Sequence, residues 1–174
     1  SIHSIAEDEK GDLWLGHTNG VIKISFKNTH KSPRKTLAEN SYIFSKYDTT
    51  SGLPEEASVK IEYMNGHILF GTSNGVYNFT DNKFIPQSSF GSSFSDVTRQ
   101  IHRIAYNNNS KTIWLETHLP DKYKFEFGYL KEKDGIYSWN ITPFLPYSNE
   151  IIHSVFHDDN GITWFGGPEG LYRY

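Results

Sequence analysis

One short motif recurs four times along the chain and limits the folds that the chain can adopt. Each copy is a polar turn, then a brief apolar strand with a large residue at its centre, and in most copies a second turn. Aligned on those large residues, the copies follow one another at intervals of 55, 45 and 50 residues. The large residues are Trp14, Leu69, Trp114 and Trp164. Self-similarity at such a period indicates an array of equivalent supersecondary units.

Each unit is expected to hold four short strands joined by turns that contain glycine. Glycine supplies the positive φ that a tight hairpin needs. The predicted structural glycines are Gly11, Gly66 and Gly161 in the first turn of a unit, and Gly20, Gly75 and Gly170 in the second. A weaker fourth strand is predicted at 42–47, 83–85 and 136–141. No segment longer than one turn has the pattern of an amphipathic helix.

Units of four antiparallel strands, repeated every 40–50 residues or so, predict an all-β fold of the β-propeller type. Neighbouring blades cover both faces of each sheet, so apolar and polar residues need not alternate strictly along a strand. Residues 113–115 and 163–165 indeed carry large groups at successive positions. The predicted repeats are 1–48, 57–86, 99–142 and 150–174 within a single segment, 1–174. This amounts to about three and three-quarter blades, a partial propeller.

We expect the segment to be part of a longer propeller, because terminal blades would otherwise lack one neighbour and be only marginally stable. An open fan also exposes sheet edges that can pair with other chains. The alternatives are a self-contained small propeller and a propeller assembled between chains.

Composition excludes several classes of function. Charge is nearly balanced, with 17 basic and 20 acidic residues, so no basic surface for nucleic acid is evident. Cysteine is absent, which removes disulfides, thiolate metal sites and cysteine nucleophiles and fits an oxidising compartment. No apolar run approaches the roughly 20 residues that span a bilayer. No nucleophile elbow, P-loop or H-E-x-x-H motif occurs. We therefore expect no catalytic residue, no metal and no cofactor.

The first unit, Asp8-x-x-Gly11-x-Leu13-Trp14-Leu15-Gly16-x-x-x-Gly20-Val21, resembles the repeat of the two-component regulator propeller family. The fourth unit, 158–171, is similar, and Ser51-Gly52-Leu53-Pro54 resembles the loop between blades in that family. The third unit departs most: Asn107 replaces the aspartate, and Glu116 stands where glycine is usual.

This resemblance implies the periplasmic sensor region of a membrane-anchored bacterial regulator. In such proteins propellers precede an immunoglobulin-like domain, a membrane span, and a histidine kinase or DNA-binding output. The implied partners are the remaining propeller blades and downstream domains of the same polypeptide, with a possible dimer of the full-length sensor. The implied ligands are oligosaccharides.

Ligand-binding residues are expected where a unit departs from the repeat, because the fold does not require them there. The loops that join blades, and those between second and third strands, should share one rim, at 49–56, 87–97, 118–123 and 145–150. Aromatic rings beside small polar groups suit a sugar, and arginines suit an anion. The candidate ligand-binding residues are Phe90, Phe94, Arg99, Arg103 and His118.

Structural explanations compete with each of these candidates. Phe90 and Phe94 would equally suit the interface between blades, and the two arginines would equally suit salt bridges. The repeated histidines His3, His102 and His153 suggest a metal site, but residues at a repeated position usually serve the repeat.

The sequence therefore favours a non-catalytic extracytoplasmic sensor segment that binds a small ligand. A protein-interaction or oligomerisation propeller without a small ligand is the second hypothesis. A propeller glycosidase or lyase is the third, and it lacks support because no pair of catalytic carboxylates can be singled out.

Overall fold

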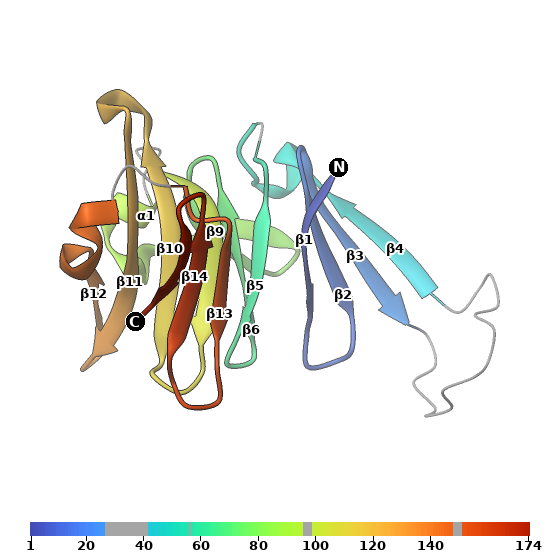
Figure 1. Cartoon of the computed structure of the whole chain (residues 1–174). Helices are drawn as coiled ribbons and strands as arrows, with labels where there is room; N and C mark the ends of the chain where they lie inside the picture. Colours follow the sequence, from blue (N-terminus) through green and yellow to red (C-terminus); the bar gives the residue numbers. More distant parts are fainter. Residues whose placement is uncertain (27–41, 56, 96–98, 148–150) are drawn as a thin grey trace.

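The chain folds into a series of antiparallel sheets (Figure 1). The structure is a computed structural model that describes residues 1–26, 42–55, 57–95, 99–147 and 151–174. The predicted rim loops 49–56, 87–97 and 145–150 therefore extend in part beyond the described residues.

Three sheets of four strands and one of three strands make up the described part of the chain. Blade 1 comprises β1 (Ile2–Glu7), β2 (Leu13–His17), β3 (Gly20–Phe26) and β4 (Tyr42–Tyr47). Blade 2 comprises β5 (Lys60–Met64), β6 (His67–Thr72), β7 (Gly75–Thr80) and β8 (Lys83–Pro86). Blade 3 comprises β9 (Gln100–Asn107), β10 (Thr112–Leu119), β11 (Lys124–Lys133) and β12 (Ile136–Asn140). Blade 4 comprises β13 (Ser154–His157), β14 (Thr163–Gly167) and β15 (Gly170–Arg173).

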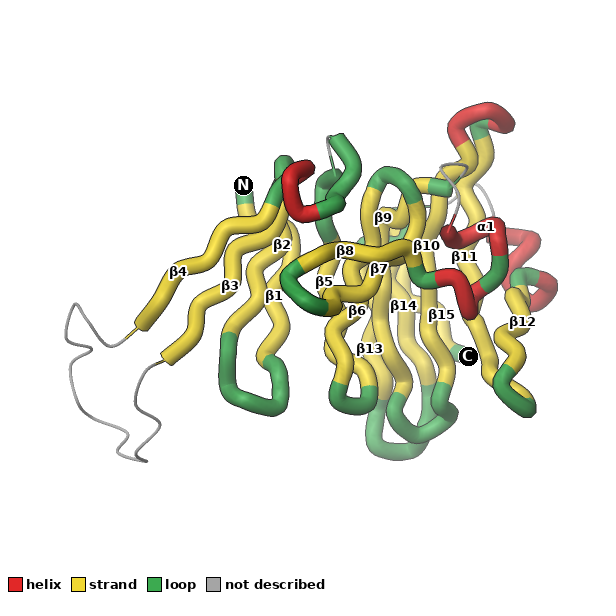
Figure 2. Tube along the Cα trace, turned by 180° about the vertical axis from the view of Figure 1, so that it is seen from behind, coloured by secondary structure: helices red, strands yellow, loops and turns green. Residues whose placement is uncertain are grey.

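Strand order within each sheet follows the chain, and the first strands β1, β5, β9 and β13 contact one another in series. This arrangement confirms the predicted all-β propeller architecture with a partial last blade. Helical segments are short and lie between strands (Figure 2). They are α1 (Ser92–Ser95) and the 3-10 turns η1 (Thr49–Ser51), η2 (Ser88–Phe90), η3 (Pro120–Lys122) and η4 (Thr142–Tyr147).

A conserved geometry links the first turn of a blade to its tryptophan. In blade 1 the carboxylate of Asp8 accepts hydrogen bonds from the backbone amides of Lys10 and Asp12 and from the indole nitrogen of Trp14, at 2.9, 3.0 and 2.8 Å. In blade 4 Asp158 makes the same three kinds of contact, including one to Trp164 at 2.9 Å. The motif aspartate thus folds the turn and orients the ring at once.

Blade 3 reaches a similar geometry with different residues. Asn107 accepts from the amides of Asn109 and Ser110, at 3.0 and 3.1 Å. The Trp114 indole donates to Thr112 instead, at 3.0 Å. The substitution of the motif aspartate therefore preserves the turn and gives the ring another acceptor.

Three hydrophobic clusters hold the blades together, one at each interface. Trp14 packs on Phe70 and Phe79 of the next blade, with ring centroids 5.5 and 5.1 Å away. Trp114 belongs to the cluster between blades 3 and 4, and Leu69 to the one between blades 2 and 3. At Trp14, Leu69 and Trp114 the repeated large residue is therefore an interblade wedge, since each side chain contributes apolar area to the contact with the following blade. Trp164, in the last blade described, belongs to none of the three clusters and is half-buried.

One register position shows why glycine follows the wedge. A Cβ on Gly16 would overlap the carbonyl oxygen of Val59, and a Cβ on Gly71 would overlap the Ile101 side chain. Both obstacles belong to the next blade. In blade 3 this position holds Glu116, whose carboxylate accepts a hydrogen bond from the backbone amide of Ile152 at 3.0 Å. Blades 1 and 2 therefore pack closely against the next blade at a glycine, whereas blade 3 contacts blade 4 at this position through a hydrogen bond to the Glu116 side chain.

The outer faces of the first and last blades carry exposed apolar side chains. In blade 4 Phe156 and Leu171 are 64% and 69% exposed, on the face that holds the half-buried Trp164. In blade 1 Ile5 and Phe44 are exposed on the face turned away from blade 2. Among the described residues, no buried hydrophobic cluster joins blade 4 to blade 1.

Candidate functional site

Strand pairing places the start of the first strand of each blade at the same edge of the sheet as the turn between its second and third strands. Lys60 at the start of β5 pairs with Gly71, and Gln100 at the start of β9 pairs with His118. We call this edge the upper rim (Figure 1). The first-to-second turns, which contain the motif aspartates, lie on the opposite edge.

A cavity of about 380 Å³ opens on the upper rim between blades 2 and 3. This volume lies within the range of small-molecule sites. We call it the rim cavity, and its lining residues are Glu55, Ser58, Lys60, Ser73, Asn74, Gln100, Ile101 and His102. Two hydroxyls, two amides, an imidazole and an ammonium group therefore converge on one space.

None of the five predicted ligand-binding residues lines the rim cavity, and the lysine that does line it, Lys60, has a perturbed pKa. Its side chain is partly buried, and its pKa is lowered by burial and by the nearby charge of Arg103. Among the described residues Lys60 forms no ion pair within 4.0 Å. The ammonium group is therefore held in the cavity wall beside another cation.

His102 extends this group of basic side chains. Its pKa is lowered by burial and by His118, Lys60 and Arg103. The imidazole is consequently held in its neutral form at neutral pH, in which one nitrogen donates and the other accepts a hydrogen bond.

His118, a predicted ligand-binding residue, lies next to the rim cavity. Its Nδ1 is 3.2 Å from the amide oxygen of Gln100, and its ring stacks on Phe125 at a centroid distance of 4.6 Å. The His102 ring stands across both, with centroids 6.0 Å from His118 and 5.4 Å from Phe125. The three rings form an aromatic group at the edge of the cavity.

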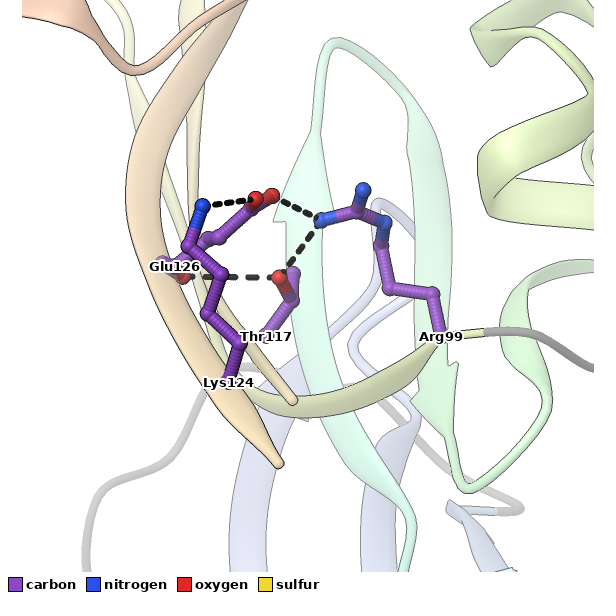
Figure 3. A network of polar contacts seen from close by, with 4 residues as sticks. All are labelled: Arg99, Thr117, Lys124 and Glu126. Atoms are coloured by element: carbon purple, nitrogen blue, oxygen red, sulfur yellow. Dashed lines mark hydrogen bonds and ion pairs between the residues drawn. The ribbon is translucent and has the colours of Figure 1, made fainter. Parts of the chain in front are cut away.

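Arg99 is buried in a polar network below the rim (Figure 3). Its Nη1 donates to Glu126 at 2.6 Å and to Thr117 at 2.8 Å. Lys124 donates to the other oxygen of Glu126 at 3.1 Å. Burial would raise the pKa of Glu126, but the hydrogen bonds from Arg99 and Lys124 outweigh it and lower the pKa. The guanidinium also lies 5.0 Å from the Phe94 ring, so Arg99 stabilises blade 3.

Arg103 connects the neighbourhood of the rim cavity to blade 4. Its Nε donates to the carbonyl oxygen of Ile152 at 2.9 Å and lies 3.7 Å from Glu116. Burial raises the pKa of Glu116, and the Ile152 amide and Arg103 partly offset that effect. Arg103 therefore has structural partners and also acts electrostatically on Lys60.

The two predicted aromatic residues face the protein interior. Phe90 and Phe94 are 4% and 1% exposed in the cluster between blades 2 and 3. Phe90 packs on Tyr137 at 4.7 Å and Phe94 on Trp139 at 5.2 Å. Both rings are covered by blade 3 and neither lines the rim cavity.

A second, larger groove of about 580 Å³ lies between blades 1 and 2 on the other side of the molecule. We call it the lower groove, and Asp8, Trp14 and Lys23 line it. Several of its charged groups have partners: Lys23 lies 2.8 Å from Asp12, Asp8 accepts from Trp14, and Glu9 accepts from Tyr63. Lys10 also lines the lower groove, and it forms no ion pair within the described residues.

Two further observations bear on the nature of the site. In the described parts of the chain, no three His, Asp or Glu side chains gather in a way that could hold a metal ion. None of the helical segments that the structure describes has the length and apolar character needed to traverse a bilayer.

Comparison with known proteins agrees with the fold and motifs. Residues 1–19 match the family model described as "two component regulator propeller". The match covers β1, the first turn and β2 of blade 1, the segment that carries the motif aspartate and Trp14. No curated protein matches the sequence.

Two similar solved structures both show the extracellular domain of the same B. thetaiotaomicron protein, BT4673, described in one as a hybrid two component system and in the other as a one component system. Their TM-scores are 0.63 and 0.62, and each is 21% identical to this chain. Each alignment covers 100% of this chain and 21% of the solved chain. The likeness establishes a common propeller fold, and this chain spans about a fifth of the length of those relatives.

Proposed function

We propose that this chain is a non-catalytic, ligand-sensing segment of the extracytoplasmic propeller of a two-component-type regulator, with an oligosaccharide as ligand. The observation that carries the proposal is the rim cavity, because its polar side chains converge on one space from two blades. The family repeat at 1–19 and the extracellular relatives of the same fold support the setting. The same comparison supports a periplasmic location.

The rim cavity suits a saccharide by its chemistry. Asn74 offers an amide donor and acceptor, and Ser58 offers a hydroxyl. Gln100 offers its amide nitrogen, because its oxygen lies 3.2 Å from His118, and Ser73 offers its hydroxyl oxygen as an acceptor, because the hydroxyl donates to the Glu55 carbonyl. The rings of His118 and Phe125 stack on each other next to Gln100 and outside the cavity lining, so they would support the sugar site from its edge. Arg99, Phe90 and Phe94 would act from beneath, by holding blade 3 in place.

A bound ligand would act on blade packing. It would contact Lys60 in blade 2 and Gln100 in blade 3, on the two sides of one interface. Arg103 lies electrostatically close to Lys60 and holds Ile152 at the start of blade 4. Through these contacts a ligand can favour one arrangement of blades 2, 3 and 4 over another.

The remaining blades and downstream domains of the same polypeptide are the proposed partners. The exposed apolar faces of blades 1 and 4 match the kind of surface that interblade clusters bury elsewhere in the chain. These faces also favour the second candidate, a propeller that acts through contacts with other chains.

Thermal shift measurements with a broad saccharide panel separate the two candidates. A ligand that binds only the folded state raises the melting temperature by mass action. We expect at least one saccharide to do so, and the Gln100→Ala variant to lose that shift. Gln87→Ala is the matched control, because Gln87 lines the lower groove. If no saccharide of the panel changes the melting temperature, the protein-contact candidate is favoured. A separate turnover assay with sialyl and uronyl substrates would indicate an enzyme if products formed.

A further inference from the structure

Lys60 occupies a position at which the propeller repeat does not require a lysine. It stands opposite Gly71, as Ser4 stands opposite Gly16 and Ser154 opposite Gly166. In blade 1 the small Ser4 hydroxyl bonds the backbone amide of Ile61 at 2.8 Å. Two of the other three blades use serine here, and blade 3 uses Arg103, which stands opposite Glu116 and lies 3.7 Å from its carboxylate. Lys60 differs from all three, because it is a long cation that faces a glycine and forms no ion pair within the described residues.

The side chain of Lys60 is also in an unfavourable environment. It is partly buried beside Arg103, and both effects disfavour its charged form. Arg103 itself has structural partners in Glu116 and Ile152. By contrast, Lys23, a half-buried lysine of the lower groove, is paired with Asp12 at 2.8 Å. A partly buried charge that has no ion-pair partner within the described structure and lines a cavity is typical of a binding site.

The neighbours of Lys60 in the rim cavity complete a donor-rich pocket. His102, Gln100 and Asn74 can each donate a hydrogen bond, and Ser58 adds a hydroxyl donor, whereas the Ser73 hydroxyl donates to the Glu55 carbonyl. One carboxylate, Glu55, also lines the rim cavity; it is exposed, so solvent screens its charge. The ammonium group of Lys60 lies partly buried, where its interaction with an opposite charge is screened less.

We propose that the rim cavity binds an acidic saccharide and that Lys60 pairs with its anionic group. This inference rests on the proposed function and names its ligand class: a sugar that carries a carboxylate or sulfate. Lys60 supplies the charge, while Gln100, Asn74 and the neutral imidazole of His102 hydrogen-bond the anion or the adjoining hydroxyls. Charge-assisted hydrogen bonds of this kind are stronger than those between neutral groups.

Paired ligands test the role of charge directly. We would titrate the chain by calorimetry with oligogalacturonate, a glucuronate-containing disaccharide and a sulfated disaccharide, each beside a counterpart whose acid is esterified or removed. We expect at least one acidic ligand to bind at least tenfold more tightly than its uncharged counterpart. Its affinity should also fall as salt rises. Inorganic sulfate, used alone, shows how much of the affinity the anion supplies without the sugar.

Two substitutions locate the site: one removes a positive charge from the rim cavity, and the other removes a negative charge. Lys60→Gln should weaken the acidic ligand at least tenfold, and Glu55→Gln should tighten it or leave it unchanged. Lys133→Gln is the matched control, because Lys133 is exposed at the end of β11. Lys60→Gln should also leave the melting temperature of the free chain unchanged or raise it, since Lys60 is repelled by Arg103. A merely structural lysine would lower that temperature instead.

The possible results separate the two proposals. If neutral saccharides bind as tightly as acidic ones, or if Lys60→Gln binds normally, the acidic-ligand inference is wrong while the sensor function stands. If no saccharide binds at all, both are wrong. Should Lys60→Gln fail to fold, the comparison of acidic with uncharged ligands on the unmodified chain still decides the question.

Discussion

The carboxylate of Glu116 lies 3.0 Å from the backbone nitrogen of Ile152, and this contact fastens blade 4 to blade 3. Glu116 replaces the motif glycine, and it is almost fully buried. Blade 4 therefore depends on a side chain where blade 2 rests against blade 1 through close backbone approach at Gly16.

Replacement of Glu116 should reveal that dependence. Glu116→Ala leaves the Ile152 amide without its acceptor, so we expect the free energy of unfolding to fall by about 2–3 kcal/mol. Glu116→Gln keeps an acceptor and should lose less. Urea titration of both variants measures the difference. Equal losses in the two variants would show that the charge, rather than the hydrogen bond to blade 4, matters at this position.

Glu62 should make stability depend on pH near neutrality. Burial raises its pKa to about 7, although the Tyr106 amide donates to it at 3.0 Å. Because the folded state holds this proton more tightly than the unfolded state, stability should fall as pH rises from about 4.5 to 7 and stay low above that. The effect reaches at most about 3 kcal/mol.

The Glu62→Gln variant tests this assignment. It keeps an acceptor for the Tyr106 amide but cannot ionise, so it should be more stable than the unmodified chain at pH 8 and similar at pH 4.5. Melting curves across this range measure the difference, with exposed Glu169→Gln as the control. A constant difference at all pH values would rule out Glu62 as the titrating group.

Asp8 lies in a surface turn, yet it should contribute substantially to the free energy of unfolding. It holds two turn amides and the Trp14 indole, so Asp8→Ala removes three hydrogen bonds. We expect a loss of about 2–3 kcal/mol by chemical denaturation. Asp8→Asn can keep the two amide contacts and should lose about half as much. A loss below about 0.5 kcal/mol in Asp8→Ala would mean that the turn and ring are held by other contacts.

The open faces should tolerate polar residues in this chain. Phe156→Ser removes an exposed ring, so we expect a change in stability below about 0.5 kcal/mol. Phe127→Ala, in the cluster between blades 3 and 4, should cost about 3–5 kcal/mol. Phe156→Ser should also reduce concentration-dependent association in sedimentation experiments. Unaltered association would show that the blade 4 face is not the surface through which copies meet.

Much of the fold could be predicted because it depends on local signals that repeat. The fourth strand predicted at 42–47 is observed at Tyr42–Tyr47, and that predicted at 136–141 is observed at Ile136–Asn140. Gly11 and Gly161 have φ of 79° and 81°, as the turn prediction requires. Motif residues specify turns through contacts a few positions away, so their spacing alone is informative.

The candidate site was harder to predict because it depends on contacts between blades. Phe90 and Phe94 lie in a loop whose sequence suits exposure or burial equally, and only the position of Tyr137 and Trp139 places them inside. Lys60 escaped notice because blade 2 departs from the motif. The available signal was a lysine within the apolar run 59–61, opposite a motif glycine.

Chemical-shift mapping tests the central claim, that the rim cavity receives the ligand. The isotope-labelled chain would be titrated with the saccharide that gives the largest thermal shift. We predict that the largest changes fall on the backbone amides of Asn74, Gln100 and His102, which line the rim cavity. Changes centred on Trp14 and Lys23 in the lower groove, or on the exposed faces of blades 1 and 4, would contradict it.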